Sequence, residues 1–298
     1  MTFKMGIDLG GTKTEVLVLD AARQPLYRQR CATPAQDYVA ILELVAAEFE
    51  QARSRFGSDM TLGIGIPGAI SPRSGLLRNS NTQSLNGRSL QQDLQSRIGC
   101  QLRIENDANC FALSEALGGV AQGYRVVFGV IIGTGTGGGL VVDGKLLNGP
   151  HRITGEWGHN PLPWRQQADG ISTCYCGKRA CIETFLSGPG MARNFARRYR
   201  RKMDSAGIVA AAEQGDASCI EMLERYYDQM ARALAQVINI IDPDAIVLGG
   251  GMSNIDSIYR QVPRRLRDYV FSDFVETPIL KAQRGDSSGV FGAALLWD

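Results

Sequence analysis

The chain has 298 residues and is 44% hydrophobic, which is long and apolar enough for two ordinary globular domains. Its 32 basic and 30 acidic residues leave a formal charge of +2, which argues against a dedicated nucleic-acid or membrane-surface binder. No stretch has the length of a signal peptide's apolar core or the roughly 18 apolar residues of a membrane span. We therefore expect a cytoplasmic protein whose partners are small molecules or a second copy of itself, and whose seven cysteines stay reduced.

The first predicted element is a glycine hairpin, MGIDLGGTKTEVLVLD, at residues 5–20. Aliphatic and β-branched residues on both sides of the glycines predict a strand, a turn and a second strand. A stretch of the same design, VVFGVIIGTGTGGGLVVDG, follows at residues 126–144, about 120 residues further on. We interpret the pair as one hairpin in each of two domains of related design.

Between the hairpins, residues 37–57 carry apolar side chains at three- and four-residue spacings, which predict an amphipathic helix capped by Asp37 and ended by Gly57. Ser89 and Gln92 form a candidate capping box for another short helix. The other predicted elements are strands at 61–66, 101–107 and 245–251 and helices at 108–119, 187–202, 206–214, 217–241 and 288–297. Strands and helices thus mix in an α/β pattern, and the longest of these helices fits a core or a dimer interface equally.

The glycine hairpins are candidate phosphate-binding turns, because backbone N–H groups without neighbouring Cβ atoms can approach an anion closely. The alternative is two tight turns in a sheet. A Walker A loop is excluded because GxxxxGK[ST] is absent, and a Rossmann loop because GTGTGGG continues into a strand and not a helix. Threonines beside the glycines in both hairpins, Thr12 and Thr14 in the first and Thr134 and Thr136 in the second, favour one nucleotide held between them.

Two further features fit a nucleotide site. Asp8 ends the first strand just before the glycines, where a carboxylate could hold a hydrated Mg²⁺ against phosphates; its alternative role is that of a turn-forming residue. A third glycine stretch, DAIVLGGGMSN at residues 244–254, would let the backbone lie flat against a nucleoside.

Polar residues further along the chain are candidates for a second substrate. Asp107 follows Asn106 where a strand gives way to a helix, and it is our candidate base for an attacking hydroxyl; helix capping is the alternative. Glu156, His159 and Glu183 carry carboxylate and imidazole groups, which are chemical types that can exchange paired hydrogen bonds with vicinal hydroxyls. Plain solvent exposure is the alternative for the two glutamates.

Three cysteines gather in CYCGKRACIE, at positions 174, 176 and 181, and His159 lies fifteen residues before the first of them. Three thiolates and one imidazole are a complete ligand set for tetrahedral structural zinc. The alternative is three reduced cysteines in a loop. Because Gly177 supplies a turn inside the cluster and a complementary histidine is in range, we expect a zinc site made by His159, Cys174, Cys176 and Cys181.

Six motifs in this order, IDLGGTKTEV, NDANCFALSEA, IIGTGTGGGL, GEWGH, CYCGKRACIE and DPDAIVLGGGMSN, closely resemble the sugar kinases of the ROK family over essentially the whole chain. The resemblance implies an actin-like ATPase (ribonuclease H-like) fold, in which two α/β domains close over ATP and a hexose. GEWGHNPLPW and GDSSGV look most like bacterial fructokinases of the mannofructokinase type, whereas NDANCFALSEA and ITGE also look like N-acetylglucosamine kinase.

The resemblance also implies the activity: transfer of phosphate from ATP to the 6-hydroxyl of a hexose, with D-fructose first and N-acetylglucosamine or a broad glucose/mannose specificity as alternatives. It makes Asp107 the catalytic base, and it assigns contacts with the hexose to Asn81, Asn106, Asp107, Glu156, His159 and Glu183. The expected nucleotide and Mg²⁺ site comprises Asp8, Gly10, Gly11, Thr12, Lys13, Gly133, Thr134, Gly135, Thr136, Gly137, Gly249, Gly250 and Gly251. ROK kinases match all four zinc positions, although this chain carries a few extra residues between His159 and Cys174.

From the order of elements we expect one domain at 1–117 plus 286–298 and a second at 118–285, the latter carrying the zinc loop, in a chain that forms a homodimer. Two other classes of protein are disfavoured. A sugar-responsive transcriptional regulator needs an N-terminal helix-turn-helix, for which the early hairpin leaves no room. An actin-like ATPase without a sugar substrate would leave the NDA, GEWGH and cysteine motifs unexplained.

Overall fold

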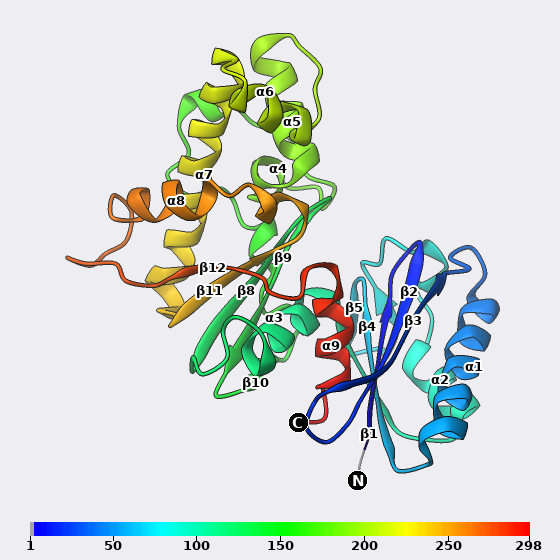
Figure 1. Cartoon of the computed structure of the whole chain (residues 1–298). Helices are drawn as coiled ribbons and strands as arrows, with labels where there is room; N and C mark the ends of the chain where they lie inside the picture. The colour runs from blue at the N-terminus through cyan, green and yellow to red at the C-terminus, as the bar shows by residue number, and fades with distance from the viewer. Residues whose placement is uncertain (1–2) are drawn as a thin grey trace.

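The computed structural model describes residues 3–298 and contains two five-stranded sheets of one design (Figure 1). The first sheet has the order β3-β2-β1-β4-β7. Its strands are β1 (Phe3–Leu9), β2 (Lys13–Leu19), β3 (Pro25–Ala32), β4 (Met60–Ile66) and β7 (Leu102–Asn106). The β1–β2 and β2–β3 pairs are antiparallel, whereas β4 lies parallel to both β1 and β7.

The second sheet repeats this arrangement in the order β10-β9-β8-β11-β12. Its strands are β8 (Val126–Ile132), β9 (Thr136–Val142), β10 (Lys145–Leu146), β11 (Ala245–Gly249) and β12 (Ile279–Lys281). Again the first pairs are antiparallel, and the strands beyond β8 are parallel. Both predicted glycine hairpins are therefore confirmed, as β1–β2 and β8–β9.

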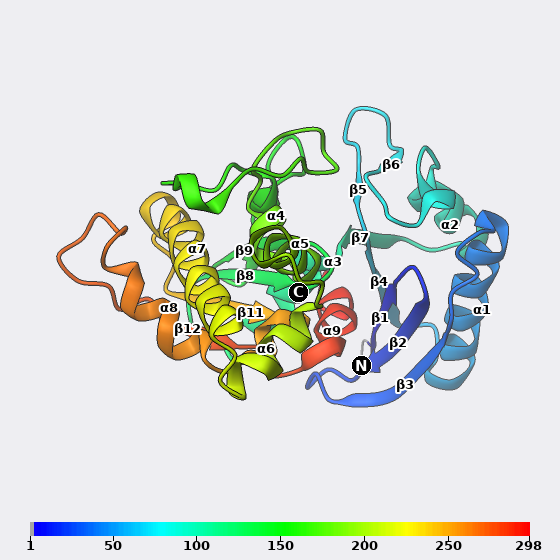
Figure 2. The ribbon, with the colours of Figure 1, turned by 90° about the horizontal axis from the view of Figure 1, so that it is seen from above.

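Two helices from distant parts of the chain lie between the sheets, α3 (Asp107–Gly118) and α9 (Ser288–Ala294) (Figures 1 and 2). The helices pack on each other, α9 against β1 and β4, and α3 against β8 and β9. Small residues make this close approach possible, because a Cβ on Gly292 would overlap the carbonyl of Cys110, and one on Gly63 would overlap the carbonyl of Ala293. The strand ends of both sheets are thereby brought to one central region.

The remaining helices cover the outer faces. The first sheet is covered by α1 (Tyr38–Phe56) and α2 (Leu90–Ile98), whose apolar residues share a core with Met5 and Ile7 of β1. The second half carries α4 (Glu183–Leu186), α5 (Gly188–Tyr199), α6 (Ser205–Glu213), α7 (Ala217–Ile241) and α8 (Ile258–Leu266). One face of α7 is buried in this second core, and the homodimer stays a prediction.

Short elements complete the chain: the β5–β6 hairpin (Ala69–Ile70, Leu77–Arg78) and the 3₁₀ turns η1 (Gln83–Leu85), η2 (Glu156–His159), η3 (Gln167–Asp169), η4 (Gly251–Asn254) and η5 (Gly285–Ser287). Within residues 3–298, no helix is both long enough and apolar enough to cross a bilayer. The cytoplasmic location stays a prediction.

Local sequence signals account for most helix ends. The carboxylate of Asp37 accepts hydrogen bonds from the N–H groups of Val39 and Ala40, and Gly57 ends α1, as expected. The expected capping box at Ser89 is wrong, because the Ser89 side chain makes no capping hydrogen bond and α2 begins without one. The last helix ends at Ala294, three residues earlier than expected, where the chain goes into turns.

Candidate active site

A cavity of about 770 Å³ lies where the two halves of the molecule meet. The first half contributes residues 67–69, Arg78, Asn79, Asn81, Asn106 and Asp107; the second contributes residues 133–138, Arg152, Ile153, Glu156, His159, Asn160, Tyr175, Cys176, Lys178 and Glu183. All six residues expected to contact the hexose therefore line this one cavity, although they come from segments up to a hundred residues apart.

Asn106 and Asp107 occupy the junction of β7 and α3. The Asn106 side chain caps the helix, with Oδ1 accepting a 2.9 Å hydrogen bond from the N–H of Ala108 and Nδ2 donating to the carbonyl of Gly68 at 3.0 Å. Asp107 also accepts from the Ala108 N–H, at 2.8 Å, and its carboxylate lies at the cavity wall. The capping role thus falls mainly to Asn106, which leaves Asp107 available to a ligand.

Burial raises the pKa of Asp107 to about 6, and the negative charge of Glu156 adds to the effect against the lowering by the Ala108 N–H. A carboxyl group with this pKa is mostly ionised at neutral pH and is a better proton acceptor than an ordinary aspartate. The position and the pKa both suit a general base.

Asp8 lies in β1 behind the first glycine turn. Gly289 of α9 leaves space for it, since a Cβ there would lie 2.8 Å from Asp8 Oδ2. Burial first, and then the charges of Asp107 and Glu15, raise the pKa of Asp8 to about 7. Glu15 is already paired with Arg28 and Arg30, so Asp8, with the charge of Asp107 nearby, is the carboxylate left for a divalent cation, and an oxygen donor of this kind fits Mg²⁺.

The first glycine turn lies beside Asn81, one of the residues expected to bind the sugar. A Cβ on Gly11 would lie 3.8 Å from Asn81 Oδ1 and 3.2 Å from Thr82 Oγ1. The Gly10 N–H donates to the carbonyl of Lys13, which closes the turn. The hydroxyl of Thr14 is buried against Thr33 at 2.8 Å, so it faces the sheet and not the cavity.

The second glycine turn separates two cavities. Gly133 and Thr134 line the 770 Å³ cavity and also a second one of about 600 Å³, which α5, α6 and Gly251 enclose. Gly251 therefore lies where a nucleoside could bind. Of the other two expected glycines, Gly249 is buried, and a Cβ there would overlap the ring of Phe111. Gly250 is exposed, with a positive φ of 81°, and a Cβ there would lie 2.5 Å from the carbonyl oxygen of Ile132.

His159 has two different neighbours. Its Nδ1 lies 3.6 Å from Cys174 Sγ, while its Nε2 lies 3.0 Å from the Tyr175 hydroxyl and 4.0 Å from Glu156 Oε2. One ring nitrogen thus faces the cysteine cluster and the other faces the cavity. This arrangement permits both roles expected from the sequence, metal ligation by one nitrogen and hexose contact by the other.

The cysteine cluster has the dimensions of a zinc site. The ligand atoms of His159, Cys174, Cys176 and Cys181 all lie within 4.8 Å of one another, and the Cys176 and Cys181 sulfurs are 3.7 Å apart. Zinc bonds of about 2.3 Å to sulfur and 2.0 Å to nitrogen in a tetrahedron place neighbouring ligand atoms about 3.5–3.8 Å apart. The residues therefore fit a bound zinc ion.

Glu183 joins this cluster to the second glycine turn. Its Oε2 accepts a 3.0 Å hydrogen bond from the N–H of Thr136, and its Oε1 lies 3.7 Å from Cys174 Sγ. The extra residues between His159 and Cys174 form a loop. Within this loop, buried Asp169 forms an ion pair with Arg232 at 2.9 Å, which attaches the loop to α7.

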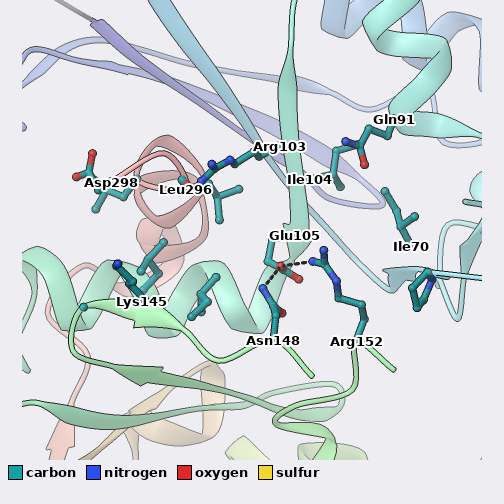
Figure 3. Close-up of a pocket in the computed structure, with 15 residues that line it drawn as sticks. Ile70, Gln91, Arg103, Ile104, Glu105, Lys145, Asn148, Arg152, Leu296 and Asp298 are labelled. Carbon is teal, nitrogen blue, oxygen red and sulfur yellow. Dashed lines mark hydrogen bonds and ion pairs between the residues drawn. The ribbon is translucent and has the colours of Figure 1, made fainter. Parts of the chain in front are cut away.

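Sequence reasoning missed a second link between the halves, which Figure 3 shows. Glu105 of β7 accepts hydrogen bonds from Asn148 at 3.1 Å and from Arg152 at 3.3 Å, through Oε2. Its Oε1 accepts from the N–H of Asn106 at 3.0 Å and from Asn109 at 3.1 Å. The only sequence signal was the position of Glu105 beside Asn106, because Asn148 and Arg152 lie more than forty residues further along the chain.

Arg152 connects this link to the site. It lines the 770 Å³ cavity and also the neighbouring cavity of about 580 Å³ drawn in Figure 3, which Arg103 and Lys145 border as well. Nearby, Arg78 donates to the carbonyl of His151 at 2.7 Å, across the same gap between the halves. Two arginine contacts thus attach the loop before Glu156 to the first half.

The sequence matches the family described as "ROK family" over residues 4–298. Among curated relatives, N-acetyl-D-glucosamine kinase from Salmonella typhimurium is 39% identical over 300 residues, and its namesake from Photobacterium profundum is 36% identical over 296; each pairing covers 98% of both chains.

Two solved structures are similar over nearly the whole chain. The ROK hexokinase from Thermus thermophilus has a TM-score of 0.89 at 28% identity, covering 99% of this chain and 97% of that one. A ROK family glucokinase from Streptomyces griseus in complex with glucose and AMPPNP has a TM-score of 0.76 at 26% identity, covering 99% and 98%.

Proposed function

The chain belongs to the ROK family and has the actin-like ATPase fold of its sugar kinases, and from this premise we propose that it transfers the γ-phosphoryl group of ATP to the 6-hydroxyl of a hexose. One observation carries the proposal. Two cavities meet at Gly133 and Thr134, and Asp107 lies in one of them. A nucleotide in the smaller cavity would direct its phosphates past this turn towards a hydroxyl beside Asp107.

The chemistry needs positioning, charge neutralisation and a proton acceptor, because phosphoryl transfer proceeds through a loose transition state. Asp107 holds the attacking hydroxyl and accepts its proton. Asp8 would hold a Mg²⁺ ion through its water shell, and that ion would neutralise charge on the phosphates. In the second turn, Thr134 and Gly135 line the larger cavity and Thr134 lines the smaller one as well, and backbone N–H groups in such glycine turns suit phosphate oxygens.

Asn106, Glu156, His159 and Glu183 orient the sugar. Their carboxylate, amide and imidazole groups are positioned around one cavity, where they can accept hydrogen bonds from vicinal hydroxyls and donate to them. Asn81 approaches from the first half, near Gly11. Closure of the two halves around the hexose would bring both sets of ligands to it and exclude water from the phosphates.

Zinc has a structural part in this proposal. With four protein ligands the ion has no open position, so it takes no step in the transfer. It would tie His159 to the segment that carries Glu183 and thereby fix two sugar-binding side chains.

Two hexoses are candidates. The relatives that are 36–39% identical bear the name N-acetyl-D-glucosamine kinase, which supports N-acetylglucosamine. The likeness of GEWGHNPLPW (155–164) and GDSSGV (285–290) to fructokinases supports fructose. Of the two, N-acetylglucosamine has the stronger support, because it rests on similarity over the whole chain, and fructose is the second candidate.

A coupled ADP-release assay across N-acetylglucosamine, fructose, mannose and glucose tests the proposal. We expect hexose-dependent ADP formation, with the highest kcat/KM for one of the two candidates. A highest value for mannose or glucose would overturn both candidates but leave the kinase assignment. Absence of hexose-dependent ADP formation with all four sugars would contradict the proposed function itself.

A further inference from the structure

A separate cavity of about 330 Å³ lies on the far side of the second half, outside the active site. It is enclosed by α5 and α7, which lie side by side in the upper part of Figure 1, and by residues 168–170 of the loop between His159 and Cys174. Its polar lining consists of Asp169, Asn194, Arg197, Arg198, Arg225 and Gln229. We call it the arginine cavity. Its volume falls at the lower end of the range for ligand sites, about 300–1,000 Å³.

The arginine cavity has more positive than negative charge. Its one carboxylate, Asp169, is already neutralised from behind by Arg232, with oxygen–nitrogen distances of 2.9 and 3.1 Å. Arg198 is paired outside the cavity with Glu221 at 3.1 Å. The other two arginines that line the cavity are Arg197 and Arg225.

Among the described residues, neither of these two arginines has a carboxylate within hydrogen-bond distance. Arg197 donates to backbone carbonyls, that of Asp169 at 2.6 Å and that of Ile171 at 3.4 Å. Arg225 lies 3.6 Å from the already neutralised Asp169. A guanidinium presents a planar fork of N–H donors that matches phosphate oxygens, so the pair suits a phosphate dianion.

The side-chain amides of Asn194 and Gln229 indicate what else the ligand would carry besides a phosphate. Asn194 and Gln229 are buried and use their N–H₂ groups on the chain itself, at Thr184 O (3.1 Å) and Asp169 Oδ1 (2.9 Å). Their carbonyl oxygens have no hydrogen-bond partner among the described residues. Buried acceptors without a donor are costly, so a ligand hydroxyl that reached either oxygen would supply the missing hydrogen bond.

We propose that the arginine cavity binds a small phosphate monoester that carries free hydroxyl groups, with its phosphate on Arg197 and Arg225 and a hydroxyl on Asn194 or Gln229. This site is distinct from the active site and does not depend on the kinase activity. Because one wall of the cavity is the loop between His159 and Cys174, the bound ligand would also hold that loop, through the Arg197 contact with Asp169.

Isothermal titration of the full chain with glycerol 3-phosphate tests the proposal, with inorganic phosphate and glycerol as companion probes. We expect saturable binding that weakens with salt, is weaker for inorganic phosphate and is undetectable for glycerol. Arg225→Gln and Arg197→Gln should each weaken it about tenfold, as loss of a charge-assisted hydrogen bond does. Arg225→Lys should recover part of the affinity.

Arg193→Gln is the matched control, because Arg193 carries the same charge on α5 but does not line the cavity. It should change the affinity less than about twofold. Equal losses in all three glutamine variants would mean diffuse attraction to a basic helix and would overturn the proposal, as would an absence of saturable binding. Thermal unfolding of each variant separates a lost ligand contact from a lost fold.

The location of the bound ester is tested in parallel. Binding should survive in Asp107→Asn, and it should slow hydrogen exchange of residues 165–173 in the wild type. If the Asp107 variant loses binding, or if protection falls on the active-site cavity instead, the ligand occupies the product position and the arginine cavity is not its site.

Discussion

The two glycine hairpins have the same local design and different surroundings. The turn of β1–β2 lies in front of Asp8, whose pKa is raised to about 7 by burial and by neighbouring carboxylates, and beside Asn81. The turn of β8–β9 separates two cavities, and its Thr136 N–H is bound by Glu183, which borders the cysteine cluster. The two turns therefore share glycine-rich composition but differ in their neighbours, and we propose a different use for each: metal and phosphate at the first turn, sugar and nucleoside at the second.

The largest effect should follow a change where the two hairpins converge. Asp107→Asn removes the proposed proton acceptor but keeps the size of the side chain, so kcat should fall by about 10²–10⁴-fold while hexose affinity stays within about tenfold. Steady-state kinetics and hexose titration measure the two quantities. Asp143→Asn, an exposed change in the β9–β10 turn, is the control. A variant that keeps more than a tenth of the wild-type kcat would reduce Asp107 to a structural residue.

The pH profile sharpens the same point. Because burial raises the pKa of Asp107 to about 6, the carboxylate that accepts the proton is lost as the pH falls through that value. The kcat/KM for the hexose should therefore be level above pH 7 and fall about tenfold per pH unit well below 6. A profile that stays flat to pH 4.5 would show that Asp107 has an ordinary pKa or no part in proton transfer.

A change at the first hairpin should affect the nucleotide more than the sugar. Asp8→Ala removes the carboxylate expected to serve Mg²⁺, so the KM for Mg-ATP should rise at least about tenfold while hexose affinity changes little. Asp20→Ala, at the other end of the same hairpin, is the matched control. If hexose binding were lost to the same extent, the substitution would have disrupted the end of the sheet, and the two turns would not have separate roles in binding nucleotide and sugar.

A substitution in the cysteine cluster, next to the second hairpin, should affect hexose binding more than nucleotide binding. Cys176→Ser removes one proposed zinc ligand and should loosen the segments that hold His159 and Glu183, so the hexose KM should rise roughly tenfold while ATP binding survives. Cys100→Ser, outside the cluster, should leave both unchanged. Metal analysis of the wild type should find one zinc per chain, and a fully active preparation free of zinc would contradict the role given to the cluster.

The smallest effect is expected at the link shown in Figure 3. Arg152→Gln breaks the ion pair with Glu105, which is half-exposed on the arginine side, and should raise the hexose KM a few-fold. A double-mutant cycle with Glu105→Gln should give a coupling of about 0.5–1 kcal/mol. Arg103→Gln, which borders the same cavity, is the control. No coupling would mean that the two halves do not communicate through this pair.

Local patterns predicted much of the molecule. Apolar spacing with Asp37 and Gly57 gave the bounds of α1, and the glycine stretches gave both hairpins, because turns and caps depend on neighbours in sequence. The ROK assignment and the actin-like fold are confirmed by the comparisons. The division into domains and the roles of the site residues stay predictions.

Contacts between segments that are distant in the sequence could not be predicted from it. The link from Glu105 to Arg152 and Asn148 exists only because α3 and α9 bring the sheets together, and nothing in the local sequence encodes that placement. Gly249 illustrates the same limit, since a glycine that packs closely against Phe111 has the same sequence signature as one that lines a ligand site; its role at the nucleotide stays a prediction, as does that of Gly250.

The central claim, transfer of the γ-phosphoryl group to a hexose 6-hydroxyl, is tested most directly by the structure of the product. Nuclear magnetic resonance of the mixture formed from ATP and carbon-13-labelled N-acetylglucosamine or fructose identifies the carbon whose signal is split by phosphorus. We predict phosphorus coupling at C6 and its neighbour C5, together with stoichiometric ADP. Phosphate attached at another carbon, or ADP formed without any sugar phosphate, would contradict it.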